Sequence, residues 1–108
     1  MKCFTVVLLF SVLSSAATLD CQVSINLDIV AKTTVFTKKK EKILVHLDDK
    51  ITSYVTELGP NIFSVEAFIP DIESRIYSEG PLNNVGESLR AAAWTRDVLA
   101  EVGCTLKR

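Results

Sequence analysis

The chain has 108 residues, a formal net charge of −1, and 48% hydrophobic residues. This length suits one domain and is too short for two. The near-neutral charge lacks the basic footprint of a nucleic-acid-binding protein, so we expect no nucleic-acid partner. The sequence contains neither a glycine-rich phosphate loop nor metal-ligand spacing, and we therefore expect no cofactor and no metal.

The first residues have the layout of a secretory signal peptide. Lys2 supplies a positive charge, residues 3–12 are mostly apolar, and small residues occupy positions 14–17. The apolar run is too short for a permanent membrane anchor. We expect a signal peptide over residues 1–17, a single secreted, extracellular domain over 18–108, and no membrane contact after cleavage. An uncleaved anchor or a buried strand is the alternative.

Cleavage leaves two cysteines, Cys21 and Cys104, near the ends of the mature chain. In an oxidising compartment an even pair predicts one disulfide. The loop-entropy model gives such a bridge somewhat over ~4 kcal/mol of stabilisation. Two unpaired, buried thiols are the alternative.

Two amphipathic segments open the mature domain. Residues 21–36 alternate between apolar and polar side chains, which predicts a long strand with one buried face. Residues 38–58 place apolar side chains at spacings of one, three and four, which predicts a helix of about five turns ending at Gly59-Pro60. The predicted stripe is Ile43, Leu44, Leu47, Ile51, Tyr54, Val55 and Leu58.

Two strands and a second helix are predicted next. Residues 61–69 alternate again, and Pro70-Asp71 suits a tight turn, so residues 72–79 are interpreted as the return strand of a hairpin. A short helix over residues 70–78 competes with that strand. Asn84 and Glu87 resemble a capping box, and a helix is predicted from there to residue 102. The buried face of the first of these strands is predicted to be Phe63, Val65, Ala67 and Ile69.

This order of elements predicts an α+β fold of the ferredoxin-like, split βαβ type, with two helices on one face of an antiparallel sheet. A regular sheet of this type would separate Cys21 from Cys104, because a strand of about ten residues spans roughly 30 Å. Residues 18–25 would then form a separate strand, folded back beside the next one by a bend at residues 26–28. Pairing between molecules, or a different topology, would also resolve the conflict. We favour the folded-back strand, which would fill a sheet edge.

Several segments carry a family resemblance. They are the strand Ile29-Val30-Ala31-Lys32, the lysine-rich turn after it, Gly59 before Phe63-Ser64-Val65-Glu66, Asp71, and Ile76-Tyr77-Ser78-Glu79. Through them, residues 29–102 resemble the antibiotic biosynthesis monooxygenase-like members of the dimeric α/β-barrel superfamily. The resemblance implies dimers formed through sheets, with cofactor-free oxygenation of polycyclic phenols in some members and binding alone in others. We assign no catalytic residue from it.

Two residues of the second predicted helix stand out. Trp94 falls near Ala91 and Val98, at the edge of the buried face or outside it. These three residues are predicted to form a contact patch for a partner, because aromatic side chains anchor interfaces. A Trp lying over the rim of the domain is the alternative. Arg96 falls among apolar neighbours and either extends its charged end to solvent or binds an anion in a pocket.

Three further side chains carry polar groups that chemistry could use. The hydroxyls of Tyr54 and Tyr77 could line a pocket between helix and sheet. The alternative is that both rings lie in the core with only their hydroxyls exposed to water. His46 is the only histidine, and it lies off the predicted apolar stripe as a surface residue.

We therefore expect a secreted domain that binds a protein partner or a small apolar ligand, as an effector, inhibitor or carrier, and it could do so as a homodimer. The candidate binding residues are Trp94, Ala91, Val98, Arg96, Tyr54 and Tyr77. The alternative is a cofactor-free, monooxygenase-like small-molecule enzyme of the dimeric α/β-barrel type, which the resemblance alone motivates.

Overall fold

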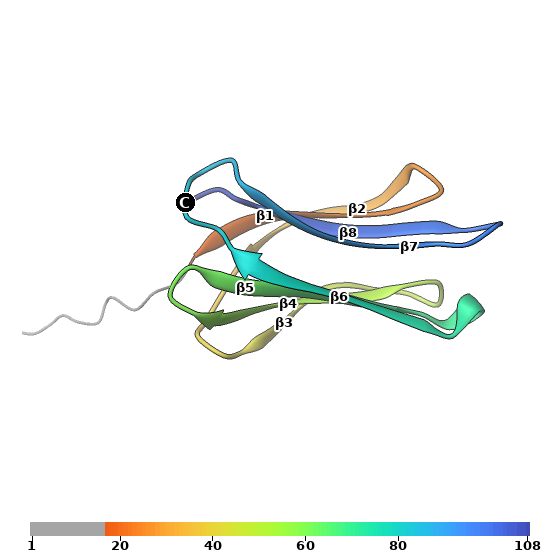
Figure 1. Ribbon diagram of the computed structural model, residues 1–108, viewed down its shortest axis with the longest axis horizontal. Helices are drawn as coiled ribbons and strands as arrows, with labels where there is room; N and C mark the ends of the chain where they lie inside the picture. Colours follow the sequence, from red (N-terminus) through yellow and green to blue (C-terminus); the bar gives the residue numbers. More distant parts are fainter. Residues whose placement is uncertain (1–16) are drawn as a thin grey trace, which may run out of the picture.

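The computed structural model describes residues 17–108, which form two antiparallel β-sheets packed face to face (Figure 1). The strands are β1 (Thr18–Ile25), β2 (Asp28–Phe36), β3 (Lys42–Leu47), β4 (Thr52–Gly59), β5 (Ile62–Ile69), β6 (Ser74–Pro81), β7 (Ser88–Trp94) and β8 (Leu99–Leu106). A 3₁₀ helix, Pro70–Ile72, precedes β6. The first sheet has the order β2-β1-β8-β7, and the second has the order β3-β4-β5-β6.

The strands follow one another around the sandwich in chain order, and the pairing of β1 with β8 closes the first sheet. The chain crosses between the sheets after β2 and again after β6, both times at the end where the C-terminus lies (Figure 1). The turns of the β1–β2, β3–β4, β5–β6 and β7–β8 hairpins lie at the opposite end, which we call the hairpin end (Figure 1).

Alternate side chains of every strand point between the sheets and form the core. On β8 the buried residues Ala100, Val102, Cys104 and Leu106 alternate with partly exposed ones. Cys104 lies directly opposite Cys21 on β1, and the two form a disulfide inside this core. The predicted bridge is therefore present, and it joins the first strand to the last.

The predicted α+β fold is wrong, because residues 17–108 contain no α-helix and the two predicted helices are pairs of strands. The first, over residues 38–58, is the β3–β4 hairpin. Its turn is closed by Asp48, whose Oδ1 accepts hydrogen bonds from the backbone nitrogens of Lys50 and Ile51 at 2.7 and 2.8 Å. The predicted stripe does not share a face: Val55 is buried, whereas Leu44 is exposed.

The second predicted helix, over residues 84–102, is β7 followed by half of β8. Three consecutive alanines favour a helix locally. Pairing with β8 overrides that preference, so that Ala91 faces the core and its neighbour Ala92 is exposed. The capping interaction survives in a loop instead: Glu87 Oε1 accepts hydrogen bonds from the backbone nitrogens of Asn83 and Asn84 at 2.7 and 3.1 Å. These bonds lower the pKa of Glu87.

Two predictions about strands are confirmed. Residues 62–69 and 74–81 form the expected hairpin, and the predicted buried face of its first strand, Phe63, Val65, Ala67 and Ile69, is buried. Residues 18–25 fold back beside β2 through a bend at Asn26 and Leu27. The folded-back strand lies between β2 and β8, however, so it is central rather than at the edge.

The predicted signal peptide lies outside the described residues except for Ala17. The backbone nitrogen of Thr37 donates a hydrogen bond to the carbonyl oxygen of Ala17 at 2.9 Å, next to the start of β1. Within residues 17–108, no helix has the length and hydropathy needed to cross a membrane.

Candidate functional site

Because side chains alternate along a strand, each sheet also has an outer face that points away from the core. The outer face of the β3-β4-β5-β6 sheet carries large apolar side chains. We call it the aromatic face and define it by Leu44, Leu47, Tyr54, Phe68 and Tyr77 around Glu66. The outer face of the β2-β1-β8-β7 sheet carries a polar hollow of about 610 Å³.

The strand register assembles the aromatic face. Leu44, Tyr54, Glu66 and Tyr77 occupy one row across all four strands, and Leu47, Thr52, Phe68 and Arg75 occupy another. The exposed fraction is 65% for Leu47, 52% for Tyr77, 48% for Leu44 and 45% for Phe68. The patch is thus continuous across the sheet and open to solvent.

Glu66 lies at the centre of the aromatic face and is only 8% exposed. Its Oε1 lies 3.4 Å from Lys42 Nζ, and its Oε2 accepts a hydrogen bond from Arg75 Nη2 at 2.9 Å. Lys42 Nζ also lies 5.1 Å from the centre of the Tyr54 ring. The buried carboxylate of Glu66 is therefore compensated by cations of the same face.

The Tyr77 hydroxyl donates a hydrogen bond to Glu79 Oε1 at 2.7 Å. This bond to a carboxylate is the main reason that the pKa of Tyr77 is raised. The phenol therefore stays neutral, with its ring on the surface and its hydroxyl fixed at the edge of the patch.

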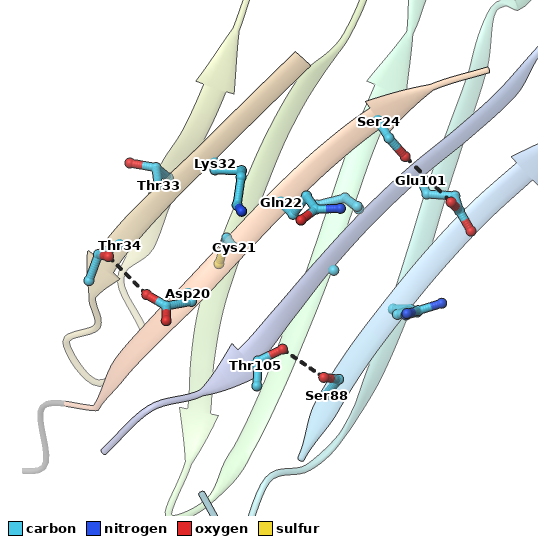
Figure 2. Close-up of a pocket in the computed structure, with 13 residues that line it drawn as sticks. Asp20, Cys21, Gln22, Ser24, Lys32, Thr33, Thr34, Ser88, Glu101 and Thr105 are labelled. Atoms are coloured by element: carbon cyan, nitrogen blue, oxygen red, sulfur yellow. Dashed lines mark hydrogen bonds between the residues drawn. The ribbon is translucent and has the colours of Figure 1, made fainter. Parts of the chain in front are cut away.

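Hydroxyl, amide and charged side chains line the polar hollow (Figure 2). The register defines its rows as Thr34–Asp20–Thr105–Ser88, Lys32–Gln22–Gly103–Arg90, and Ile29–Ser24–Glu101–Ala92. Thr34 Oγ1 donates to Asp20 Oδ1 at 2.8 Å, and Ser24 Oγ lies 3.4 Å from Glu101 Oε1 (Figure 2). The two carboxylates of the hollow thus have neighbouring hydroxyls as partners.

The middle row of the hollow differs from its neighbours. Within residues 17–108, neither Lys32 nor Arg90 takes part in a salt bridge. Gly103 lies beside Arg90, and a Cβ atom on Gly103 would come within 3.2 Å of Arg90 Cγ. The aliphatic part of Arg90 therefore packs beside the bare backbone at Gly103.

The structure brings some predicted binding residues together and separates others. Tyr54 and Tyr77 share a row, but on an outer face rather than beneath a helix. Trp94 is 84% exposed at the end of β7, whereas Ala91 is buried and points to the other side of the sheet. Val98 is half-buried in the β7–β8 turn, so the three do not form one patch. Arg96 is exposed in the same turn and lines neither of the hollows found.

Trp94 belongs to the last row of the first sheet. It pairs with Leu99, and Leu99 exchanges hydrogen bonds with Asn26: Asn26 N donates to Leu99 O at 2.7 Å, and Leu99 N donates to Asn26 Oδ1 at 2.8 Å. Leu27, next to Asn26, is 76% exposed. The hairpin end therefore holds two exposed apolar side chains on two joined turns.

His46 is partly buried on β3, with its Nε2 2.7 Å from Asp48 Oδ2. This contact does most to lower the pKa of Asp48 to about 2, and the two backbone donors add to it. No group of three side chains within residues 17–108 could hold a metal ion. Leu44, Leu47 and Arg90 were missed because they lay in predicted helices, and only a strand places them outward. Phe68 and Lys32 lay in predicted strands but were not among the candidate binding residues.

The chain matches no protein-family model, no curated protein and no solved structure. The resemblance to the monooxygenase-like family therefore stays a prediction that no match tests, and the helices predicted within the same residues are strands. An enzyme of that kind would need an enclosed pocket with convergent Tyr54, Tyr77, Arg96 or His46. The structure distributes these four over an outer face, a turn of the other sheet and a partly buried position.

Proposed function

We propose that this protein is a secreted binding module that docks a protein partner through its aromatic face. The observation that carries the proposal is the exposure of Leu44, Leu47, Phe68 and Tyr77 on one sheet surface. The outer faces of sandwich sheets are ordinarily polar. Large exposed apolar patches on soluble proteins mark interaction sites.

The residue types support a protein partner. Aromatic side chains and arginine are enriched where interfaces concentrate their binding energy. Tyr54, Tyr77, Phe68 and Arg75 all lie on this one face. Glu66 is only 8% exposed and already contacts Lys42 and Arg75, so a partner that excludes water does not leave this carboxylate unpaired.

The interior argues for a protein partner over a small apolar ligand. Val23, Val55, Val65 and Val102 have no exposed surface and fill the space between the sheets. The polar hollow lies on an outer face of the sandwich and not between the sheets. Secretion remains part of the proposal on two supports, the signal-peptide layout and a disulfide that suits an oxidising compartment.

The test compares two double variants, each of which replaces two large exposed side chains by serine. Phe68→Ser with Tyr77→Ser removes two anchors from the aromatic face. Trp94→Ser with Leu27→Ser removes one aromatic and one aliphatic residue from the hairpin end of the other sheet. Partners are captured on immobilised mature protein from the extracellular fluid of the source organism, purified, and their affinities for the three proteins are measured by biolayer interferometry.

We expect at least about a tenfold loss of affinity for the aromatic-face variant, as for interface hot spots, and wild-type binding for the hairpin-end variant. Equal binding by all three proteins, or loss only in the hairpin-end variant, would refute the proposed face. Light scattering after size exclusion runs alongside. If the wild type is a dimer and the aromatic-face variant is a monomer, the aromatic face binds a second copy of this chain. The proposal of a different protein partner would then be refuted.

A further inference from the structure

We propose that the polar hollow of the first sheet binds an acidic oligosaccharide, a sugar chain whose units carry carboxylate or sulfate groups, through Lys32 and Arg90. The site lies on the opposite outer face from the aromatic face. It is therefore independent of the proposed protein-docking surface.

The hollow contains two positive charges that have no acidic partner within the described residues. Lys32 and Arg90 are the two cations of the middle row, and no carboxylate among the described residues pairs with either. Asp20 and Glu101 in the adjacent rows have hydroxyl partners, Thr34 and Ser24. The acid groups of the ligand would supply the partners that Lys32 and Arg90 lack, and arginine binds carboxylate and sulfate-like anions with two parallel hydrogen bonds.

The middle row also contains a glycine. Gly103 lies in the interior of a central strand, where glycine weakens a sheet and often marks a close approach. Its φ is not positive, so no turn requires it. Arg90 occupies the space beside Gly103. A Cβ atom at position 103 would lie only 3.2 Å from Arg90 Cγ. Gly103 thus leaves room for the aliphatic part of Arg90 at the side of the hollow.

The distance between the strands that carry the two cations bears on the length of the ligand. Lys32 on β2 and Arg90 on β7 are separated by β1 and β8, so their backbones lie three strand spacings, or roughly 14 Å, apart. A sugar chain with two or more acid groups can span the distance between these two strands and pair with both cations.

The lining between the two cations bears on the chemistry of the ligand. Gln22, Thr105 and Ser88 present amide and hydroxyl groups, which both donate and accept hydrogen bonds. Sugar hydroxyls also do both, so they match this surface. Peptides are usually held at a sheet edge or by pockets for alternate side chains, and this hollow lies across the face of the sheet instead.

The experiment is calorimetric titration of the mature protein at physiological ionic strength with four probes of similar length. They are a galacturonate hexasaccharide, a heparin-derived hexasaccharide, neutral maltohexaose and hexaglutamate. We expect one or both acidic sugars to bind at least tenfold more tightly than maltohexaose and hexaglutamate. Tighter binding of the galacturonate or of the heparin-derived hexasaccharide shows whether the natural sugar chain carries carboxylate groups alone or sulfate groups as well.

Variants then locate the site. Lys32→Ala and Arg90→Ala should each weaken the better sugar at least fivefold. Lys50→Ala removes the same charge from the β3–β4 turn and should leave affinity unchanged. Gly103→Ala keeps every charge but displaces Arg90, and it should weaken binding at least threefold, with amide spectra showing an intact fold.

Three results would overturn the proposal. The first is that maltohexaose or hexaglutamate binds as tightly as the acidic sugars. The second is that Lys50→Ala and Arg90→Ala lose the same affinity for the better sugar. The third is that neither acidic sugar binds. The first would make the site a general polar or anionic surface, and the second would make the attraction a property of overall charge.

Discussion

At the scale of single residues, Asp48 closes the β3–β4 hairpin. Its carboxylate accepts hydrogen bonds from two backbone nitrogens and contacts His46, which together lower its pKa to about 2. The charged form is therefore bound more strongly in the folded state than in the unfolded chain, where aspartate has a pKa of about 3.9.

This difference predicts how the hairpin responds to acid. A lowered folded pKa contributes stability that is complete above about pH 4 and is lost as the pH falls through about 2. Carbon-detected NMR of the Asp48 carboxyl group should titrate with a midpoint near 2. Asp48→Asn keeps the Oδ1 acceptor but not the charge, so it should reduce the loss of stability over this range. A titration midpoint near 4 would contradict the contact with His46.

Leu27 shows a residue whose backbone does not suit its side chain. Its φ is +72°, in the left-handed region, and its side chain is exposed. Left-handed backbone costs a non-glycine residue roughly 1–2 kcal/mol. Leu27→Gly should therefore raise the free energy of unfolding by about 1 kcal/mol in urea titrations.

Leu47→Gly is the matched control for this change. Leu47 is also an exposed leucine, but it lies in a strand. Glycine in a strand should lower the free energy of unfolding by roughly 0.5–1 kcal/mol. Destabilisation of both variants to the same extent would mean that the turn conformation carries no strain.

At the scale of elements, one buried contact holds the crossing from β2 to β3. Thr37 has no exposed surface, and its hydroxyl donates a hydrogen bond to Glu57 Oε1 on β4 at 2.7 Å. Lys40, in the same crossing, donates its backbone N–H to the Glu57 carbonyl oxygen at 2.7 Å. The Glu57 carboxylate is buried, with Glu57 only 3% exposed, and of these two neighbours only the Thr37 hydroxyl bonds to it.

Thr37→Val keeps the shape of the side chain and removes the donor. The buried carboxylate loses a partner, and the free energy of unfolding should fall by about 1–3 kcal/mol in urea titrations. Thr37→Ser retains the hydroxyl and should recover most of that loss. Equal stability of the valine variant and the wild type would show that Glu57 does not need this bond.

The elements also show where sequence patterns suffice. The β5–β6 hairpin could be predicted because Phe63, Val65, Ala67 and Ile69 alternate without interruption. The β3–β4 hairpin could not, because its register shifts between Leu44 and His46, and β4 also shifts its register against β5 between Glu57 and Gly59. A bulge adds one residue and breaks period-two alternation, and the resulting spacings resemble those of a helix.

The candidate site, like the fold, could be predicted only in part from the sequence. Tyr54 and Tyr77 were singled out, but only the register of four strands places them in one row. The predicted patch at Trp94 depended on a helical wheel, whereas a strand sends Trp94 and Ala91 to opposite faces. Lys32 and Arg90 come from strands far apart in sequence, so no local pattern could have paired them.

At the scale of the whole molecule, the disulfide joins the two central strands of the first sheet across 83 residues of sequence. It therefore closes nearly the whole domain. Replacing Cys21 and Cys104 by alanine should lower the free energy of unfolding by about 2–5 kcal/mol in urea. Reductant should destabilise the wild type by a similar amount and leave the double variant unchanged. A wild type insensitive to reductant, with free thiols by mass, would contradict the bridge.

The central claim is that residues 38–58 and 84–102 are strands, since this alone creates the two outer faces. Nuclear Overhauser contacts in isotope-labelled mature protein test it most directly. We expect cross-strand backbone contacts at Val55–Val65 and at Ala91–Val102, pairs that lie opposite one another in the sheets. Contacts between residues three apart throughout either segment would mean helices, and would remove both the aromatic face and the polar hollow.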